Sequence, residues 1–215
     1  CEIIDGFLCQ IDTEEIKEKI LALRPQVVGF SLYQDSLKSF SEIAAFIRKE
    51  MAFVHITAGG FLVSFNFDWL FSSFPGLIDS VVVGEGEITF SELAEKIIGG
   101  KDWHNTPGIA FRENGQTFKS RVREKISSLD CLPFPDRPTL RDTLLQINPV
   151  HICASRGCYG NCTFCSVNSY GRLNGGGKWR GRSIGNIIDE IEMLIKKHGA
   201  NYFKFIDDCF FPPRN

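Results

Sequence analysis

The sequence predicts an α/β protein in which a parallel, doubly wound sheet is followed by a second strand–helix segment. Three observations lead to this prediction. Short apolar runs alternate with helical periodicities over the first hundred residues, an order typical of parallel strands joined by helices. A hairpin signal and a proline-rich stretch interrupt the alternation. A new strand–helix–strand pattern then begins near residue 147.

The elements of the first hundred residues follow in order. Asp12 and Glu15 form a capping-box pattern that predicts the start of one helix. Thr89 and Glu92 repeat that pattern before another. Apolar runs of the kind found in buried parallel strands mark the strands. Expected strands cover residues 2–5, 27–31, 53–57 and 80–83, and a further expected helix covers residues 37–47.

Polar and glycine residues follow three of these predicted strands. In a parallel sheet, ligands bind beyond the carboxyl ends of the strands, so these residues are candidates for a binding site. They are Ser31, Gly59, Gly60, Gly84 and Glu85. The alternative is that the glycines only form turns.

Residues 101–145 differ from what precedes them. Asn114-Gly115 lies between two strand-like runs and predicts a hairpin. Residues 132–138 contain three prolines, which cannot continue a helix or a central strand. We therefore expect a first domain at 1–100, a hairpin and linker at 101–145, and a second domain at 146–215.

The second domain has its own elements. Residues 146–154 and 202–206 are expected strands, and Ser183 is expected to cap the helix between them, which Gly199 ends.

Composition excludes some classes of function. Lys and Arg number 24 and Asp and Glu 26, for a net charge of −2, so nothing indicates nucleic acid as a partner. No run reaches the ~18 apolar residues of a membrane span. The sequence starts at Cys1 and ends at Asn215, shortly after an apolar run and Pro212-Pro213, and we expect it to be a fragment truncated at both ends.

Eight cysteines stand at positions 1, 9, 131, 153, 158, 162, 165 and 209. Four of them fall within residues 153–165, and no secretory pattern accompanies them. Crowded cysteines in such a chain more often bind metal than form disulfides, which favours the cytoplasm as location.

Cys158, Cys162 and Cys165 are spaced C-x3-C-x2-C on a loop after a predicted strand. Thiolates are soft ligands that suit iron–sulfur clusters, and a four-iron cluster normally takes four of them. Three ligands from one loop would leave one iron open. Zinc is the alternative, although structural zinc usually uses two ligand pairs with a longer spacer. For such a zinc ion, the candidate fourth ligands are Cys153, His151 and Cys209.

The cysteine triplet, with Phe164 before its third cysteine, resembles the signature of the radical S-adenosylmethionine (SAM) enzymes. Further segments narrow the resemblance to the branch in which a cobalamin-binding domain precedes the radical domain. These segments are Ser155–Cys158, Gly84–Glu87, Leu132–Arg137, Trp179–Ser183 and Phe205–Asp208.

The resemblance implies a flavodoxin- or Rossmann-like cobalamin-binding domain, read from its second strand onward, and then the start of a partial (β/α)6 barrel. It implies a 4Fe-4S cluster on the three cysteines, SAM on the open iron, and cobalamin on the first domain. Ser31 would face the corrin, and Gly59 and Gly60 would admit the nucleotide tail. Any histidine ligand to cobalt would lie before Cys1.

For SAM, the resemblance implies polar contacts from Asp207 and Asp208, with Phe164 beside the cofactor. The alternative is that one aspartate of the pair only caps the loop that follows. Arg180 and Arg182 are candidates to bind an anionic group of a cofactor. The alternative is that they belong to an exposed basic loop. Tyr159 replaces a proline that is frequent in the family. His55, inside a predicted strand, is expected to be structural.

These features predict an enzyme that transfers a methyl group to an unactivated centre. The alternative is a cobalamin-dependent radical cyclase of the magnesium-protoporphyrin ester cyclase type. A more remote one is a zinc-stabilised binding module without catalysis. The expected partners are a small-molecule substrate, which the sequence does not identify, and an electron donor such as flavodoxin or ferredoxin.

Overall fold

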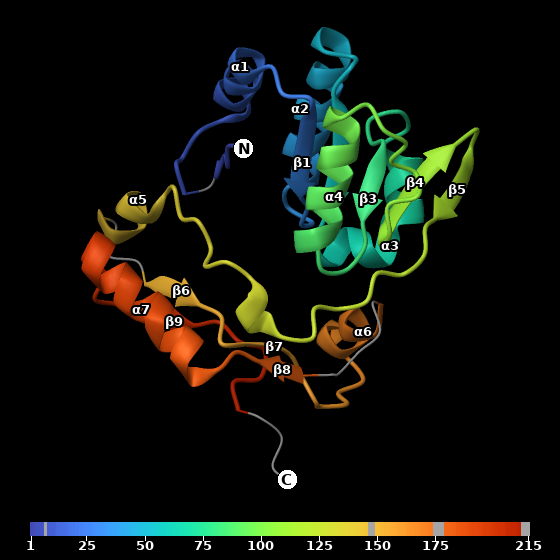
Figure 1. The fold of residues 1–215 in the computed structure, drawn as a ribbon. Coiled ribbons are helices and arrows are strands. Elements are labelled where there is room, and N and C mark those ends of the chain that lie inside the picture. The colour runs from blue at the N-terminus through green and yellow to red at the C-terminus, as the bar shows by residue number, and fades with distance from the viewer. Residues whose placement is uncertain (7, 146–148, 174–178, 212–215) are drawn as a thin grey trace. The chain divides into compact units, whose positions relative to one another are not determined.

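The computed structural model describes residues 1–6, 8–145, 149–173 and 179–211, and the chain divides into two compact units (Figure 1). The sheet unit contains residues 12–125. The cysteine unit contains the described residues of the segments 1–11, 126–172 and 179–211. Each unit has its own sheet and core.

The sheet unit is built on five strands in the order β1-β2-β3-β4-β5. β1 (Val27–Ser31), β2 (His55–Gly59) and β3 (Ser80–Val82) are parallel, as predicted. β4 (Ile109–Glu113) and β5 (Gln116–Lys119) form the predicted hairpin, and β4 pairs antiparallel with β3. Both turn residues, Asn114 and Gly115, have positive φ, as a two-residue hairpin loop requires.

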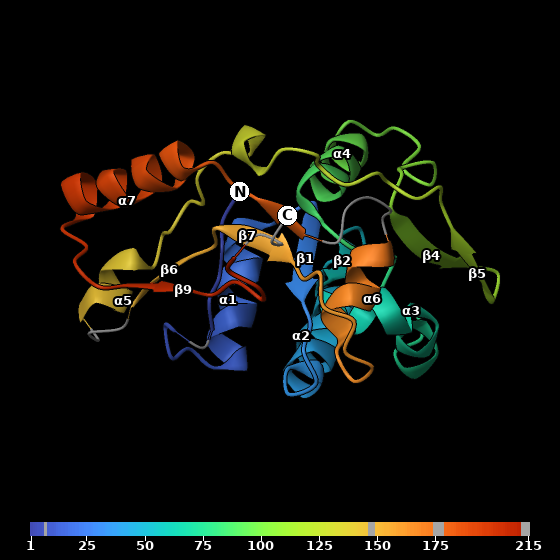
Figure 2. The ribbon, with the colours of Figure 1, turned by 90° about the horizontal axis from the view of Figure 1, so that it is seen from below.

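Four helices cover this sheet. They are α1 (Thr13–Leu23), α2 (Leu37–Glu50), α3 (Phe61–Ser73) and α4 (Glu87–Ile98). Figures 1 and 2 show α4 on one face of the sheet and α2 and α3 on the other. Gly29 of β1 permits the close approach of α4, since a Cβ there would lie 3.1 Å from the Phe90 ring.

Some sequence predictions for this unit are wrong. Residues 2–5 form no strand, and β2 begins at His55 rather than at Phe53. Thr89 is not a helix cap, because α4 begins at Glu87. The Thr89 hydroxyl is buried instead and accepts a hydrogen bond from Arg123 Nε at 2.8 Å. The Asp12 cap is confirmed, since its carboxylate accepts from the Glu14 and Glu15 amides.

The cysteine unit contains two short sheets. β6 (Val150–Ile152) pairs parallel with β9 (Phe203–Phe205), and β7 (Ser155–Gly157) pairs antiparallel with β8 (Trp179–Gly181). α5 (Leu140–Leu145), α6 (Ser166–Leu173), α7 (Ile184–His198) and a short turn of helix at Leu129–Cys131 complete it. Its core joins α5, β6 and α7 through Leu140, Val150, Ile152 and Leu194.

The α7 boundaries agree with the sequence prediction. The Ser183 hydroxyl accepts from the Asn186 amide, and Gly199 ends the helix in the left-handed region. Of the strand predicted over 146–154, the structure contains Val150–Ile152, while 146–148 lie outside the described residues. Within the part of the chain that the structure describes, no helix has the length and apolar character needed to cross a membrane.

Candidate functional site

The structure brings Ser31, Gly59 and Gly60 together at the carboxyl ends of β1 and β2. Ser31 pairs with Gly59 across the two strands, and the Leu32 amide donates to the Gly59 carbonyl at 3.1 Å. Gly60 has φ +105°, and a Cβ there would lie 3.5 Å from the Leu32 carbonyl oxygen and 3.8 Å from Ser31 Oγ. Only glycine adopts this backbone without strain. The side chain of Ser31 is exposed at this edge.

Ser64 of α3 connects this edge to the next strand end, and the sequence analysis missed it. Its buried hydroxyl donates to the Gly60 carbonyl at 2.7 Å and accepts from the Gly84 amide at 3.0 Å. Gly84, with φ +82°, and the half-buried Glu85 therefore belong to the same edge as Gly60. No sequence signal pointed to Ser64, because without a predicted helix at α3 nothing placed this residue beside the strand ends.

His55 is structural, as the sequence predicted. Its ring is buried, hydrogen-bonds to Ser80 Oγ at 2.8 Å and packs edge-on against Trp103. Burial lowers the pKa of His55 from 6.5 to about 4, with the charge of Arg48 acting in the same direction and that of Asp79 against it.

This pKa predicts a pH-dependent stability. Because the folded-state pKa lies below the unfolded one, the unfolded chain takes up the proton first as the pH falls. Stability is therefore complete above pH 6.5 and decreases toward pH 4, by about 3 kcal/mol from this residue. Urea unfolding at pH 7 and pH 4.5 should show this loss for the native chain and a smaller one for His55→Leu. Equal losses in the two chains would contradict the assignment.

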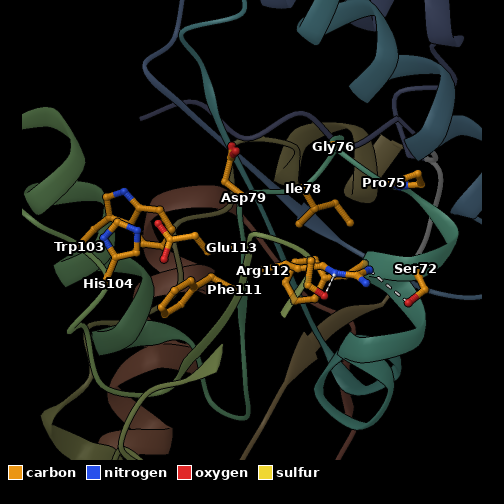
Figure 3. Close-up of a pocket in the computed structure, with 12 residues that line it drawn as sticks. Ser72, Pro75, Gly76, Ile78, Asp79, Trp103, His104, Phe111, Arg112 and Glu113 are labelled. Atoms are coloured by element: carbon orange, nitrogen blue, oxygen red, sulfur yellow. Dashed lines mark hydrogen bonds between the residues drawn. The ribbon is translucent and has the colours of Figure 1, made fainter. Parts of the chain in front are cut away.

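A cavity of the sheet unit lies away from the strand ends that carry Ser31 and Gly60. It encloses about 630 Å³ and is lined by residues around the start of β3 and by the β4–β5 hairpin (Figure 3). Asp79 in its wall already binds Arg48 and the Ile56 amide, and Arg112 binds Ser72 and the Gly115 carbonyl. None of the sequence-predicted site residues lines it.

In the cysteine unit, Cys158 follows β7 directly and Cys165 directly precedes α6. The Gly160 amide donates to Cys158 Sγ at 3.2 Å. A Cβ on Gly160 would lie 3.2 Å from Cys158 Sγ and 3.9 Å from Cys162 Sγ, so these two thiols flank Gly160. Among the described residues, no three His, Cys, Asp or Glu side chains surround one metal-ion position. Phe164 is 91% exposed.

Asp207 and Asp208 follow β9 and differ in their surroundings. Asp207 accepts from the Ser155 hydroxyl at 2.5 Å and from the Ala154 amide at 3.2 Å, so it fixes the strand that leads into the cysteine loop. Asp208 is exposed and hydrogen-bonds to no described residue. Neighbouring atoms partly desolvate its carboxyl group, and this desolvation, followed by the charge of Asp207, raises the pKa of Asp208.

A buried ion triad lies beside β6, where its arginines donate to the His151 and Cys153 carbonyls. The carboxylate of Glu190, 1% exposed, binds Arg137 at 2.8 Å and Arg182 at 2.5 Å. Arg182 also donates to the Cys153 carbonyl, and its guanidinium lies 5.6 Å from the centre of the Phe134 ring. Arg182 is therefore not on an exposed basic loop, and the proline-rich segment is bound to β6 and α7 through Arg137.

Removing the central charge of the triad is expected to destabilise the cysteine unit strongly. Glu190→Gln keeps the shape but leaves two buried guanidinium groups without a counter-charge, which should cost about 3–5 kcal/mol of unfolding free energy. Glu192→Gln is the matched control, because its ion pair with Lys196 is exposed and contributes little. Equal stability of the two variants in urea would contradict a role for the triad.

Comparison with known proteins identifies the first region and shows which solved structures share the fold of the chain. Residues 3–94 match the family model of the B12-binding domain. The structure of OxsB, described as a cobalamin-dependent SAM radical enzyme with aqua-cobalamin and SAM bound, aligns with a TM-score of 0.81 at 22% identity, over 96% of this chain and 28% of OxsB. The methyltransferase TsrM of Kitasatospora setae, with cobalamin and a [4Fe-4S] cluster bound, aligns at 0.72 and 20% identity, over 96% and 42%.

Sequence relatives cover nearly the whole chain as well. An uncharacterized methyltransferase of Pyrococcus horikoshii is 30% identical over 212 residues, which are 97% of this chain and 45% of that protein. The anaerobic magnesium-protoporphyrin IX monomethyl ester cyclase of Rubrivivax gelatinosus is 24% identical, over 95% of this chain and 37% of its own. The chain contains a B12-binding domain and shares its fold, along nearly its whole length, with cobalamin-dependent radical SAM enzymes. It spans less than half the length of these two relatives.

The residues of both regions have chemistry that suits the cofactors named for these solved structures. Gly60 presents no side chain at the strand ends and Ser31 is exposed beside it, so a ligand such as cobalamin could approach the backbone there. The cysteine loop offers three thiols and an amide already aimed at one sulfur. A cluster takes each thiolate at a different iron, so its ligands need not converge on one point.

Proposed function

We propose that this chain contains the cobalamin and cluster sites of an enzyme that transfers a methyl group to an unactivated centre. The observation that carries the proposal is the occurrence of both sites in one chain, a B12-binding domain and a three-thiol loop. The methyltransferases among the relatives and solved structures support it. When bound, the three cofactors supply the radical and the transferable methyl group.

In this proposal, residues 1–100 form the cobalamin domain, 101–145 the hairpin and linker, and 146–215 the beginning of the radical domain. Ser31, Gly59, Gly60, Gly84 and Glu85 bind cobalamin at the carboxyl ends of the strands. The part of Ser64 is to hold the Gly60 and Gly84 loops in register, since its hydroxyl bonds to both.

Cys158, Cys162 and Cys165 hold the cluster in this proposal, with Phe164 exposed beside it for contact with a cofactor. Asp208 is assigned to the ammonium group of SAM, because its carboxylate is uncommitted to described residues and a charge-assisted hydrogen bond is a strong one. Asp207 orients the strand before the loop through Ser155 and Ala154.

The partners in this proposal are a small-molecule substrate and an electron donor such as flavodoxin or ferredoxin. A cluster that must be reduced needs such a donor, and a reducing compartment such as the cytoplasm keeps the thiols free.

Product analysis of the complete enzyme tests the proposal. The enzyme would be given a chemical reductant, cobalamin, SAM labelled in its methyl group, and fractions of small molecules from its own cells. We expect label in one fraction, with S-adenosylhomocysteine and 5′-deoxyadenosine released in about equal amounts, because one SAM serves each task. Release of 5′-deoxyadenosine with an unmethylated product would refute methyl transfer.

That contrary result would favour the second candidate, a cobalamin-dependent radical cyclase. The observation behind it is the likeness to the Rubrivivax cyclase along 95% of this chain. The two candidates share every residue assignment made above, so only the product separates them. A zinc-stabilised module would release neither nucleoside product.

A further inference from the structure

Asn168 closes the cysteine loop from inside α6, three residues after Cys165. Its side chain is buried, with 9% of the residue exposed. Its Nδ2 donates to the Gly160 carbonyl at 2.6 Å and reaches Asn161 Oδ1 at 3.4 Å. One carboxamide thus bonds the loop at its midpoint, between Cys158 and Cys162.

The orientation of this carboxamide follows from its partners. Both neighbouring groups are oxygen acceptors, so turning the carboxamide over would place oxygen against oxygen at 2.6 Å. The Nδ2 group therefore faces the loop. The Gly160 residue then has both backbone groups bound, its carbonyl by Asn168 and its amide by Cys158 Sγ.

The other end of the carboxamide has an unusual feature. Asn168 Oδ1 is buried and has no hydrogen-bond partner among the described residues. A buried acceptor without a partner is costly, so a carboxamide here needs a compensating role. Its short bond to the Gly160 carbonyl supplies one, because that bond restrains the residue whose amide donates to Cys158 Sγ.

We propose that Asn168 is a positioning residue, which holds the cysteine loop so that the Gly160 amide is directed at Cys158 Sγ. The inference rests on the cluster site proposed above. Amide hydrogen bonds to ligand sulfurs stabilise the reduced form of iron–sulfur clusters and so raise their reduction potential. Asn168 would act on the cluster through Gly160, without touching it.

Hydrogen exchange of the full chain without cluster tests the positioning directly. Asn168→Leu keeps the size of the side chain and removes the donor. The peptide covering residues 158–165 should exchange about tenfold faster in this variant, the change that loss of one hydrogen bond produces. Peptides of α7 should be unchanged. Asn66→Asp is the matched control, since the exposed Asn66 bonds to the Leu62 carbonyl far from the loop in sequence.

The second measurement is the midpoint potential of the reconstituted cluster, which should become more negative in Asn168→Leu and stay unchanged in Asn66→Asp. Asn168→Ala, which creates space instead of adding an apolar branch, should give the same two results if Asn168→Leu fails to fold. A folded variant with native exchange of 158–165 and a native potential would overturn the inference. If the native chain takes up no cluster, the proposed function fails, while the exchange result still decides the role of Asn168.

Discussion

Replacing any one of Cys158, Cys162 and Cys165 by alanine is expected to abolish the iron–sulfur absorbance of the anaerobically reconstituted protein. In the proposed site the cluster has three protein ligands, so each variant would keep only two thiolates and leave two irons without a protein ligand. Iron content per chain should fall with the absorbance. No folding defect is expected, because Cys162 is exposed and Cys158 and Cys165 are only partly buried.

Cys131 and Cys9 provide matched controls, since both are exposed thiols outside the loop. Changing either to alanine should leave the absorbance and the iron content intact. If the three loop variants keep native iron, or if a control loses it, the cluster lies elsewhere.

A bulky side chain at Gly60 is expected to remove most of the cobalamin affinity. Gly60→Val places a branched side chain at φ +105°, with its Cβ 3.5 Å from the Leu32 carbonyl and 3.8 Å from Ser31 Oγ. The strand edge would then be both strained and filled. We expect the Kd to rise by a factor of about 100 or more, equivalent to about 3 kcal/mol, in a titration followed by absorbance.

Gly76→Val separates backbone strain from the loss of space. Gly76 also has positive φ, at +74°, but a Cβ there would meet no atom within 4 Å. This variant should lose stability as Gly60→Val does and still bind cobalamin with native affinity. Native affinity in folded Gly60→Val would remove the site from this edge.

Local sequence signals located β1, β2, β3 and the hairpin, although they also predicted a strand at residues 2–5 that does not form. Asn114-Gly115 predicted the hairpin because few residue pairs tolerate two positive φ angles. α3 escaped prediction because apolar residues lie on all sides of it, so no helical stripe is visible in Phe61–Ser73. Thr89 fits a capping pattern, yet α4 starts two residues earlier and buries its hydroxyl.

The candidate site was predictable only where a sequence motif points to it. The spacing of Cys158, Cys162 and Cys165 alone indicates a metal-binding loop. The supporting residues act through side-chain contacts that no motif in the sequence marks. Glu190 binds Arg137, 53 positions away in the sequence, and Asn168 reaches Gly160 only because α6 folds back over the loop.

The metal and corrin content of the purified protein tests the central claim most directly. After anaerobic reconstitution with iron, sulfide and cobalamin, and removal of unbound material, each chain should retain about four irons, about four sulfides and one cobalamin. A stoichiometric zinc ion with neither iron nor corrin bound would contradict the account.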